Sequence, residues 1–133
     1  MAGTKKKTRE KLDKIFSEYV RLKEAKEGGL VICYTCGVER HWKQMHAGHF
    51  QTRAKYATRF DPMNVKPQCV KCNIFNHGEQ YTFALKLDQE YGTGTAERIK
   101  RASEATARAT EGHYQELIDT YKELVKRLKE KVE

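Results

Sequence analysis

Two pairs of cysteines constrain this chain more than any other sequence feature. Cys33 and Cys36 form one Cys-x-x-Cys pair, Cys69 and Cys72 form the other, and these are all four cysteines of the protein. Such a pair places two thiolates on one metal from a tight turn, and two pairs complete a tetrahedral zinc site. Two disulfides are the alternative, but the reducing cytosol disfavours them. We therefore predict a structural zinc that joins two segments distant in sequence.

The bulk composition fits a small domain that needs such a metal. Of 133 residues, 38% are hydrophobic and 33% are charged, so the core is lean, and metals often stabilise segments this small. No apolar run approaches the ~20 residues of a membrane span, and the N-terminus lacks the apolar stretch of a signal peptide. We expect a cytoplasmic protein without membrane contact. The net charge of +8 is compatible with a polyanionic partner, for which nucleic acid is the default.

Hydrophobic periodicity predicts helices on both sides of the cysteine-bearing segment. We expect an α+β, mostly helical fold in a single domain over residues 1–133. Its parts are an N-terminal helix (4–27), a zinc-bound core (30–78) and a helical C-terminal part (79–133). Within these parts we expect strands at 30–32 and 46–51, a turn at 37–44, a polar loop at 52–61, a helical start after residue 73, and helices at 80–91, 96–107 (with Thr95 as N-cap) and 111–132.

The last of these helices carries the clearest pattern. Its apolar residues follow a 3-4 alternation over nearly three heptads, which is typical of a helix that packs along another helix. The partner is either the first helix of the same chain or a second subunit.

Residues between and beside the cysteine pairs carry a second pattern. His49, Asn64 and Asn73 follow one another in the order that resembles the signature of HNH (ββα-metal) nucleases, in which two strands and a helix hold one divalent cation. A narrower resemblance is to the NinG/Rap family of lambdoid phages, and a more distant one is to phage endonuclease VII. The NinG/Rap resemblance spans roughly residues 10–130, and its specific motifs are Cys33-x-x-Cys36-Gly37, Ala47-Gly48-His49-Phe50, Arg59-Phe60-x-x-x-Asn64 and Gln68-Cys69-Val70-x-Cys72-Asn73.

The resemblance implies a structure-specific endonuclease, from a phage or prophage in a bacterial host, that cuts branched recombination intermediates such as Holliday junctions or D-loops. His49 is then the general base, because imidazole titrates near neutral pH and takes a proton from water. Asn64 orients that imidazole. Asn73 offers an amide oxygen suited to Mg²⁺, and a bound Mg²⁺ or Mn²⁺ stabilises the leaving oxygen.

The chain departs from the HNH pattern at the residue before the base. Many HNH nucleases have an aspartate there as a metal ligand, whereas this chain has Gly48. We assign the second ligand to His46, and a histidine ligand favours Mn²⁺, Co²⁺, Ni²⁺ or Zn²⁺ over Mg²⁺. Asn76 and His77, near the start of the expected helix, are further candidates.

Basic residues around this segment are the expected DNA contacts. We expect four of them to meet phosphates, namely Arg53, Lys55, Arg59 and Lys71. The basic face of the first helix either tracks phosphates or is simply solvated. For Trp42 and Tyr56 we expect packing rather than stacking on bases.

Three functions are compatible with these features. The first is cleavage of branched DNA, the second is nicking or cutting of ordinary duplex by an HNH enzyme, and the third is a non-catalytic zinc module that binds DNA in a recombination complex. A junction has two-fold symmetry and needs two paired nicks, so the first function predicts a homodimer formed through helices.

Overall fold

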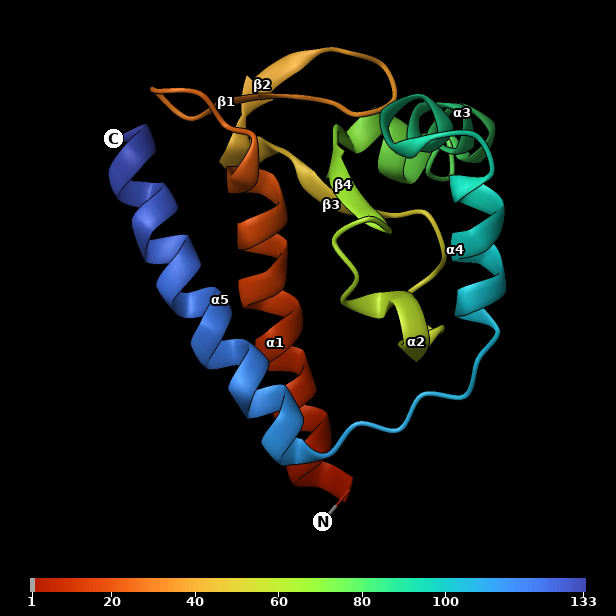
Figure 1. The fold of residues 1–133 in the computed structure, drawn as a ribbon. Coiled ribbons are helices and arrows are strands. Elements are labelled where there is room, and N and C mark those ends of the chain that lie inside the picture. Colours follow the sequence, from red (N-terminus) through yellow and green to blue (C-terminus); the bar gives the residue numbers. More distant parts are fainter. Residues whose placement is uncertain (1) are drawn as a thin grey trace.

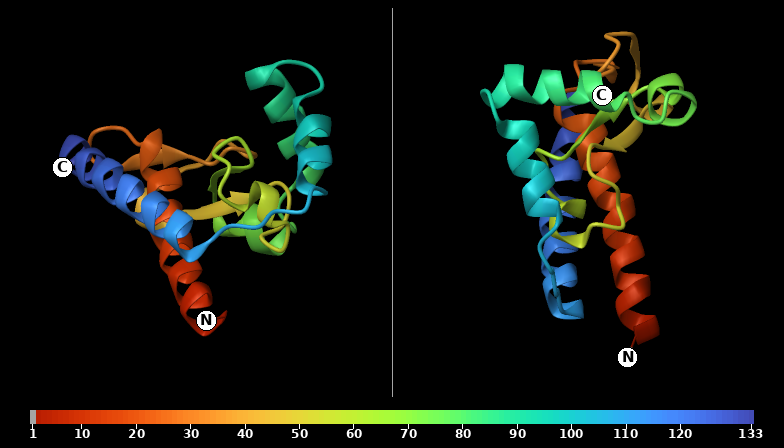
Figure 2. Two further views of the ribbon diagram at one scale, coloured as in Figure 1. Left: turned by 60° about the horizontal axis from the view of Figure 1, so that its bottom comes forward. Right: turned by 90° about the vertical axis from the view of Figure 1, so that its right-hand side faces the viewer.

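We describe residues 2–133 in a computed structural model; Met1, the first residue of the expected single domain, lies outside them. Two long helices, α1 (Ala2–Lys23) and α5 (Glu111–Val132), lie side by side and run in the same direction (Figures 1 and 2). Thr8 bonds Glu111 where both helices begin, and Glu18 pairs with Lys129 farther along. The apolar face of α5 therefore packs on the first helix of the same chain, one of the two expected partners.

Two small antiparallel sheets follow α1. β1 (Leu30–Ile32) pairs with β2 (Glu39–His41), and β3 (His46–His49) pairs with β4 (Val65–Gln68). The turn expected at 37–44 is wrong, since this stretch forms β2 and a 3₁₀ turn, η1 (Trp42–Gln44). β3 also ends at His49 rather than at residue 51, because beyond it the Asn64 N–H bonds the Asp61 carbonyl and the Gln51 N–H bonds the side chain of Asn64.

Four shorter helical elements complete the chain, and α3 and α4 flank the β3–β4 sheet on the side away from α1 (Figure 1). The expected loop at 52–61 contains one helical turn, and the expected helix after residue 73 is a π-helical turn that already begins at Lys71. These elements are α2 (Tyr56–Arg59), η2 (Lys71–Phe75), α3 (Gln80–Tyr91) and α4 (Thr95–Ser103).

The boundaries of α4 correct one prediction. Thr95 is the first residue of the helix and not its N-cap, since its hydroxyl donates to the Gly92 carbonyl. Asp88 of α3 instead accepts a hydrogen bond from the Ala96 N–H at 2.9 Å, which satisfies one of the free donors of the first turn. Helix α4 then stops at Ser103, four residues before the expected end.

The buried side chains form three clusters that hold the sheets in place. One surrounds the cysteines and includes Trp42 and Val125, the second lies between α1 and α5 around Phe16, and the third joins Phe50 to Phe83 of α3. The β3–β4 sheet is thus fixed from both sides. Across residues 2–133, every helix is too short or too polar to span a lipid bilayer.

Candidate active site

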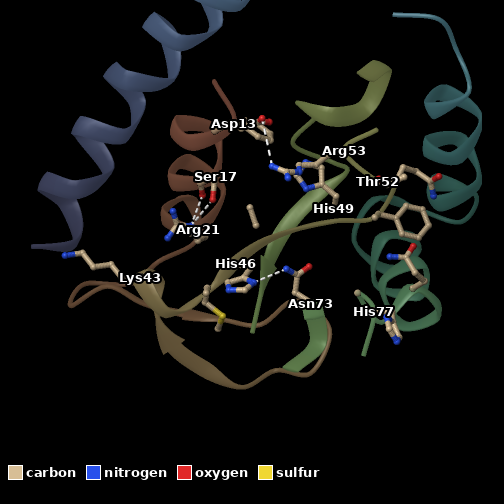
Figure 3. A pocket seen from close by; sticks show the side chains of 17 residues that line it. Asp13, Ser17, Arg21, Lys43, His46, His49, Thr52, Arg53, Asn73 and His77 are labelled. Atoms are coloured by element: carbon tan, nitrogen blue, oxygen red, sulfur yellow. Dashed lines mark hydrogen bonds and ion pairs between the residues drawn. The ribbon is translucent and has the colours of Figure 1, made fainter. Parts of the chain in front are cut away.

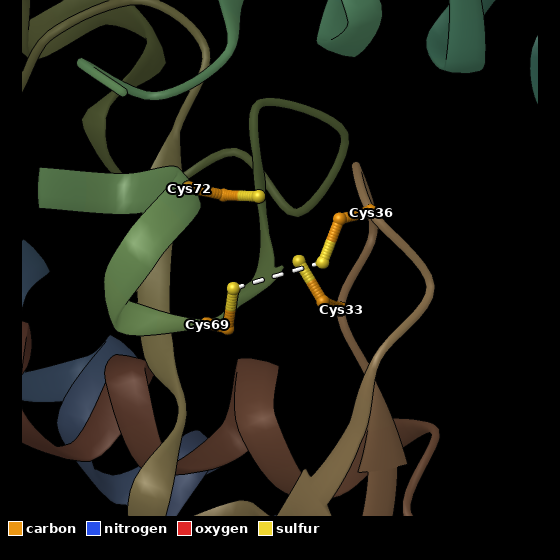
Figure 4. Close-up of side chains that lie close together, drawn as sticks. All are labelled: Cys33, Cys36, Cys69 and Cys72. Atoms are coloured by element: carbon orange, nitrogen blue, oxygen red, sulfur yellow. Dashed lines mark hydrogen bonds between the residues drawn. The ribbon is translucent and has the colours of Figure 1, made fainter. Parts of the chain in front are cut away.

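The four cysteines lie together as the spacing predicts (Figure 4). All four sulfurs lie within 4.8 Å of one another, and the Sγ atoms of Cys36 and Cys69 are 3.7 Å apart. Tetrahedral zinc with bonds of about 2.3 Å requires sulfurs ~3.8 Å apart. The geometry therefore fits zinc, which would join the end of β1 to the start of η2.

The ionisation of these thiols also favours a metal. Burial raises the pKa of the Cys72 thiol, so a cation is needed to hold it as thiolate. Burial likewise disfavours the thiolate of Cys33, but backbone N–H groups of Cys69 and Cys36 outweigh this effect and lower its pKa to about 6. The backbone of Cys36 and Cys69 thus favours the thiolate of Cys33, which is the form that binds a cation.

A hollow of about 950 Å³ opens between α1, β3 and the loop that follows η2 (Figure 3). Most of the catalytic and metal-binding candidates that we predicted from the sequence line this hollow. His46 and His49 reach it from the two ends of β3, Asn73 from η2, and Arg53 from the loop after β3. The histidines of β3 and Asn73 of η2, which lie far apart in sequence, are thereby brought to one site.

His49 is oriented by a contact with the backbone of Arg59. Its Nε2 lies 3.0 Å from the carbonyl oxygen of Arg59. A carbonyl only accepts hydrogen bonds, so the neutral ring carries its proton on Nε2 and keeps the lone pair on Nδ1. Burial lowers the pKa of His49 from its ordinary value, and the charge of Arg53 acts in the same direction. The His49 imidazole is therefore neutral at neutral pH.

Asn64 holds the loop that supplies this carbonyl. The side chain is fully buried; its Oδ1 accepts from the Gln51 N–H at 2.7 Å, and its Nδ2 donates to the carbonyls of Gln51 and Thr58, both at 3.0 Å. Asn64 thereby ties both ends of residues 51–58 together, directly before Arg59. Asn64 therefore reaches His49 only indirectly, through the loop that carries the Arg59 carbonyl.

His46 and Asn73 form a pair beside His49. The amide Nδ2 of Asn73 lies 3.0 Å from Nδ1 of His46, so this ring nitrogen presents its lone pair to the amide. A half-turn of the amide places its oxygen there instead. Two ligands at ~2.1 Å from an octahedral cation are about 3.0 Å apart, so this pair fits one edge of a divalent cation site. His77 also lines the hollow but lies apart from the pair (Figure 3).

The structure explains why glycine precedes His49. His46, Ala47 and His49 of β3 line the hollow, whereas Gly48, between Ala47 and His49, is not among the described residues that line it. A Cβ at Gly48 would lie 1.9 Å from Oε1 of Gln68, which is completely buried and whose Nε2 donates to Thr35 and to the Gly78 carbonyl. An aspartate at this position would meet Gln68 rather than a metal in the hollow.

The rim of the hollow is cationic. Arg21, Lys43 and Arg53 line it, and among the described lining residues the single carboxylate is Asp13. Asp13 accepts hydrogen bonds from Nε and a terminal nitrogen of Arg59, whose side chain is only 12% exposed. This corrects the phosphate contact expected of Arg59, because its charge is neutralised and its guanidinium is covered.

The other expected DNA contacts remain accessible. Arg53 and Lys55 are exposed in the loop after β3, and Lys71 is exposed on η2. Asn76 is exposed at the end of η2 and is not among the described residues that line the hollow.

Sequence reasoning missed the contribution of α1 to this site. Asp13, Ser17 and Arg21 recur every four residues and form one polar stripe along the helix. Arg21 is fixed there, since its Nε donates to the carbonyl and hydroxyl of Ser17 and a terminal nitrogen donates to the Trp42 carbonyl. A polar stripe on a helix normally faces solvent, so the sequence alone does not mark this one as part of a site. Only the docking of α1 against β3 places it at the hollow.

Comparisons with known proteins place the chain in a family. Searches of curated proteins and of solved structures found no match. A family model described as "Bacteriophage Lambda NinG protein" matches residues 2–133, which is nearly the entire chain. This agrees with the resemblance carried by the cysteine pairs and the motifs around His49 and Asn64. The chain therefore belongs to the family of the bacteriophage lambda NinG protein.

Proposed function

We propose that this protein is a metal-dependent DNA endonuclease with an HNH-type (ββα-metal) centre, and that it cuts branched DNA. The observation that carries the proposal is one hollow containing a neutral, oriented His49 and a His46–Asn73 pair beneath a cationic rim. The antiparallel β3–β4 pair followed by η2 supports the HNH assignment, because it supplies two strands and a helical turn in that order.

Each residue has a separate task in hydrolysis of the phosphodiester. His49 accepts the proton of the attacking water on Nδ1, since the Arg59 carbonyl holds the proton on Nε2. Asn64 keeps this carbonyl in place through three hydrogen bonds. His46 and Asn73 would hold a divalent cation, which would supply charge at the scissile phosphate and at the leaving 3′ oxygen.

The cationic rim positions the DNA backbone. Arg21, Lys43 and Arg53 surround the hollow, and a phosphate there gains charge-assisted hydrogen bonds from preorganised donors. Arg21 is the best prepared of the three, because its guanidinium is already held by Ser17 and by the Trp42 carbonyl. The exposed Lys55 and Lys71 extend this cationic surface away from the hollow.

The two neutral ligands, imidazole and amide, determine how the cation binds. Neutral donors attract Mg²⁺ weakly, and imidazole favours Mn²⁺ and later transition ions. The DNA phosphate must therefore supply the anionic ligand, so cation and DNA should bind together.

Paired nicks at a junction require two active sites, and for this we propose a homodimer. The heptad face of α5 is covered by α1, so the contact between two copies must use another surface. Light scattering of the protein alone and on junction DNA tests this, and a monomer in both states would contradict it.

The proposal is tested by cleavage of matched four-way, flap and linear DNA with Mg²⁺ or Mn²⁺, using the wild type and His49→Ala. We expect cutting of the branched substrates, faster with Mn²⁺, and loss of cutting in the variant. Equal cutting of linear duplex would support the ordinary duplex nuclease instead. Binding without any cleavage under all conditions would support the non-catalytic zinc module.

A further inference from the structure

Exposed apolar side chains gather in one segment of the chain. Among the residues that the structure describes, the two most exposed large apolar or aromatic side chains are Tyr81 (79%) and Phe75 (73%). Val70, Ile74 and Leu85, in the same segment, are exposed as well. Apolar groups concentrated on a surface in this way usually mark a binding site.

This surface adjoins the hollow. His77, Gly78 and Gln80 line the hollow, and they occupy the stretch of chain between the two rings. Phe75 is two residues from His77, and Tyr81 directly follows Gln80. Both rings are therefore close in sequence to residues that line the hollow.

The loop between the two rings is strained and is restrained by hydrogen bonds. His77, Gly78 and Glu79 have φ values of +52°, +86° and +50°, a left-handed run that is strained at its two non-glycine residues. Two hydrogen bonds hold this loop. Gln68 Nε2 donates to the Gly78 carbonyl, and the Gly78 N–H donates to the Cys72 carbonyl. The zinc ligand Cys72 thus anchors the loop, and rings presented on a fixed loop lose little entropy on binding.

The fold itself leaves the rings uncovered. Tyr81 and Leu85 are one turn apart on α3, on the face opposite to the buried Phe83 and Leu87. Phe75 is the last residue of η2 and is likewise turned to solvent.

We propose that Phe75 and Tyr81 form a stacking surface for unpaired nucleobases, and that this surface gives the protein its preference for branched DNA. The inference rests on the proposed function. Exposed rings on elements that also carry exposed cations, here Lys71 on η2 and Lys86 on α3, are the combination that binds single-stranded nucleic acid. In a continuous duplex the bases stack on each other and offer no free face, whereas a branch point offers several. A second copy is disfavoured at this surface, because a symmetric contact would bring the exposed Lys71 and Lys86 of both copies together.

The test measures binding without cleavage. Zinc-loaded protein in a His49→Ala background is titrated, by fluorescence anisotropy, into a flap DNA with an unpaired arm and into a linear duplex of equal length. In Phe75→Leu/Tyr81→Leu, which keeps the surface apolar but removes the rings, we expect flap affinity to fall about tenfold for each ring. Affinity for the linear duplex should change less than about twofold, since each lost stack belongs to an unpaired base.

Two control variants separate stacking from other effects. Tyr81→Phe keeps the ring and should bind the flap as the parent does. Ile32→Ala removes an exposed apolar side chain on β1, far from the rings in sequence, and should also leave flap affinity unchanged. Equal losses on flap and linear DNA, or no loss on either, would overturn the proposal.

Further outcomes distinguish the surface from the chemistry. If sedimentation shows a dimer that Phe75→Leu/Tyr81→Leu makes monomeric while DNA preference persists, a second copy occupies the surface and the proposal is wrong. Binding that depends on the rings, in a protein whose wild type cuts no DNA, would support the surface and remove the proposed chemistry. Cleavage that does not depend on the rings would support the proposed chemistry and contradict the stacking surface.

Discussion

Removing the Asn64 side chain tests how the structure orients His49, the proposed catalytic base. Asn64→Ala leaves the Thr58 carbonyl and both backbone polar groups of Gln51 without their partner. The Thr58 carbonyl is buried with its residue, and an unsatisfied buried group costs ~1–3 kcal/mol. Gln51 is half-buried, so water partly replaces the hydrogen bonds of its two backbone groups. Each of these groups then costs about 0.5 kcal/mol. The expected loss of unfolding free energy is therefore about 3 kcal/mol.

The assay is urea unfolding of the zinc-loaded protein, followed by the fluorescence of Trp42, the single tryptophan of the chain. Trp42 is buried in the cluster that contains the zinc cysteines, so it reports on the part of the fold that holds the site. Asn76→Ala is the matched control, because Asn76 is exposed at the end of η2. It should change stability by less than about 0.5 kcal/mol.

Activity supplies the second half of this test. A typical domain with 5–15 kcal/mol of stability remains folded after such a loss, so cleavage by folded Asn64→Ala can be measured. We expect a rate loss of up to about 100-fold, because the Arg59 carbonyl no longer fixes His49. A stability change below about 1 kcal/mol, or full activity in a clearly destabilised variant, would refute the reasoning.

Three further predictions follow from the same contacts. Strong chelation of zinc should unfold the protein at the sheets and change the fluorescence of Trp42, and a folded apoprotein would contradict this. Gly48→Ala should lose about 1–3 kcal/mol by overpacking against buried Gln68, whereas Gly112→Ala in α5, where an added Cβ would meet only Thr110 Oγ1 at an ordinary contact distance of 3.8 Å, should be neutral or slightly stabilising. The protonated ring of His49 has no lone pair and burial lowers its pKa; kcat/KM should therefore fall with decreasing pH only below about 6.5, and a midpoint above that value would count against the assignment.

Local patterns predicted the parts of this fold that local physics determines. The spacing of the cysteines predicted the metal site, and apolar periodicity predicted α3 and α5 with their observed bounds. β2 and β4 were missed for identifiable reasons. β2 consists of three polar residues, Glu39–His41, with no apolar alternation, and β4 contains Pro67, which breaks the ladder of donors in a strand.

Features that depend on distant contacts could not be predicted. Nothing near Arg59 in the sequence indicates that Asp13 neutralises it, because the pair forms only when α1 docks beside the loop. The same docking gives Arg21 its place at the hollow. The heptads of α5 predicted a helical partner but did not identify α1, since any complementary apolar stripe satisfies the pattern.

The central claim is that His49 activates water in a nuclease site. The most direct measurement is the single-turnover rate of cutting an end-labelled four-way junction by zinc-loaded protein with Mn²⁺, for the wild type and His49→Ala. Zinc content and unfolding free energy are checked to be equal in both proteins. We predict cleavage by the wild type and a rate at least about 100-fold lower in the variant. Equal rates in the two proteins would contradict the claim.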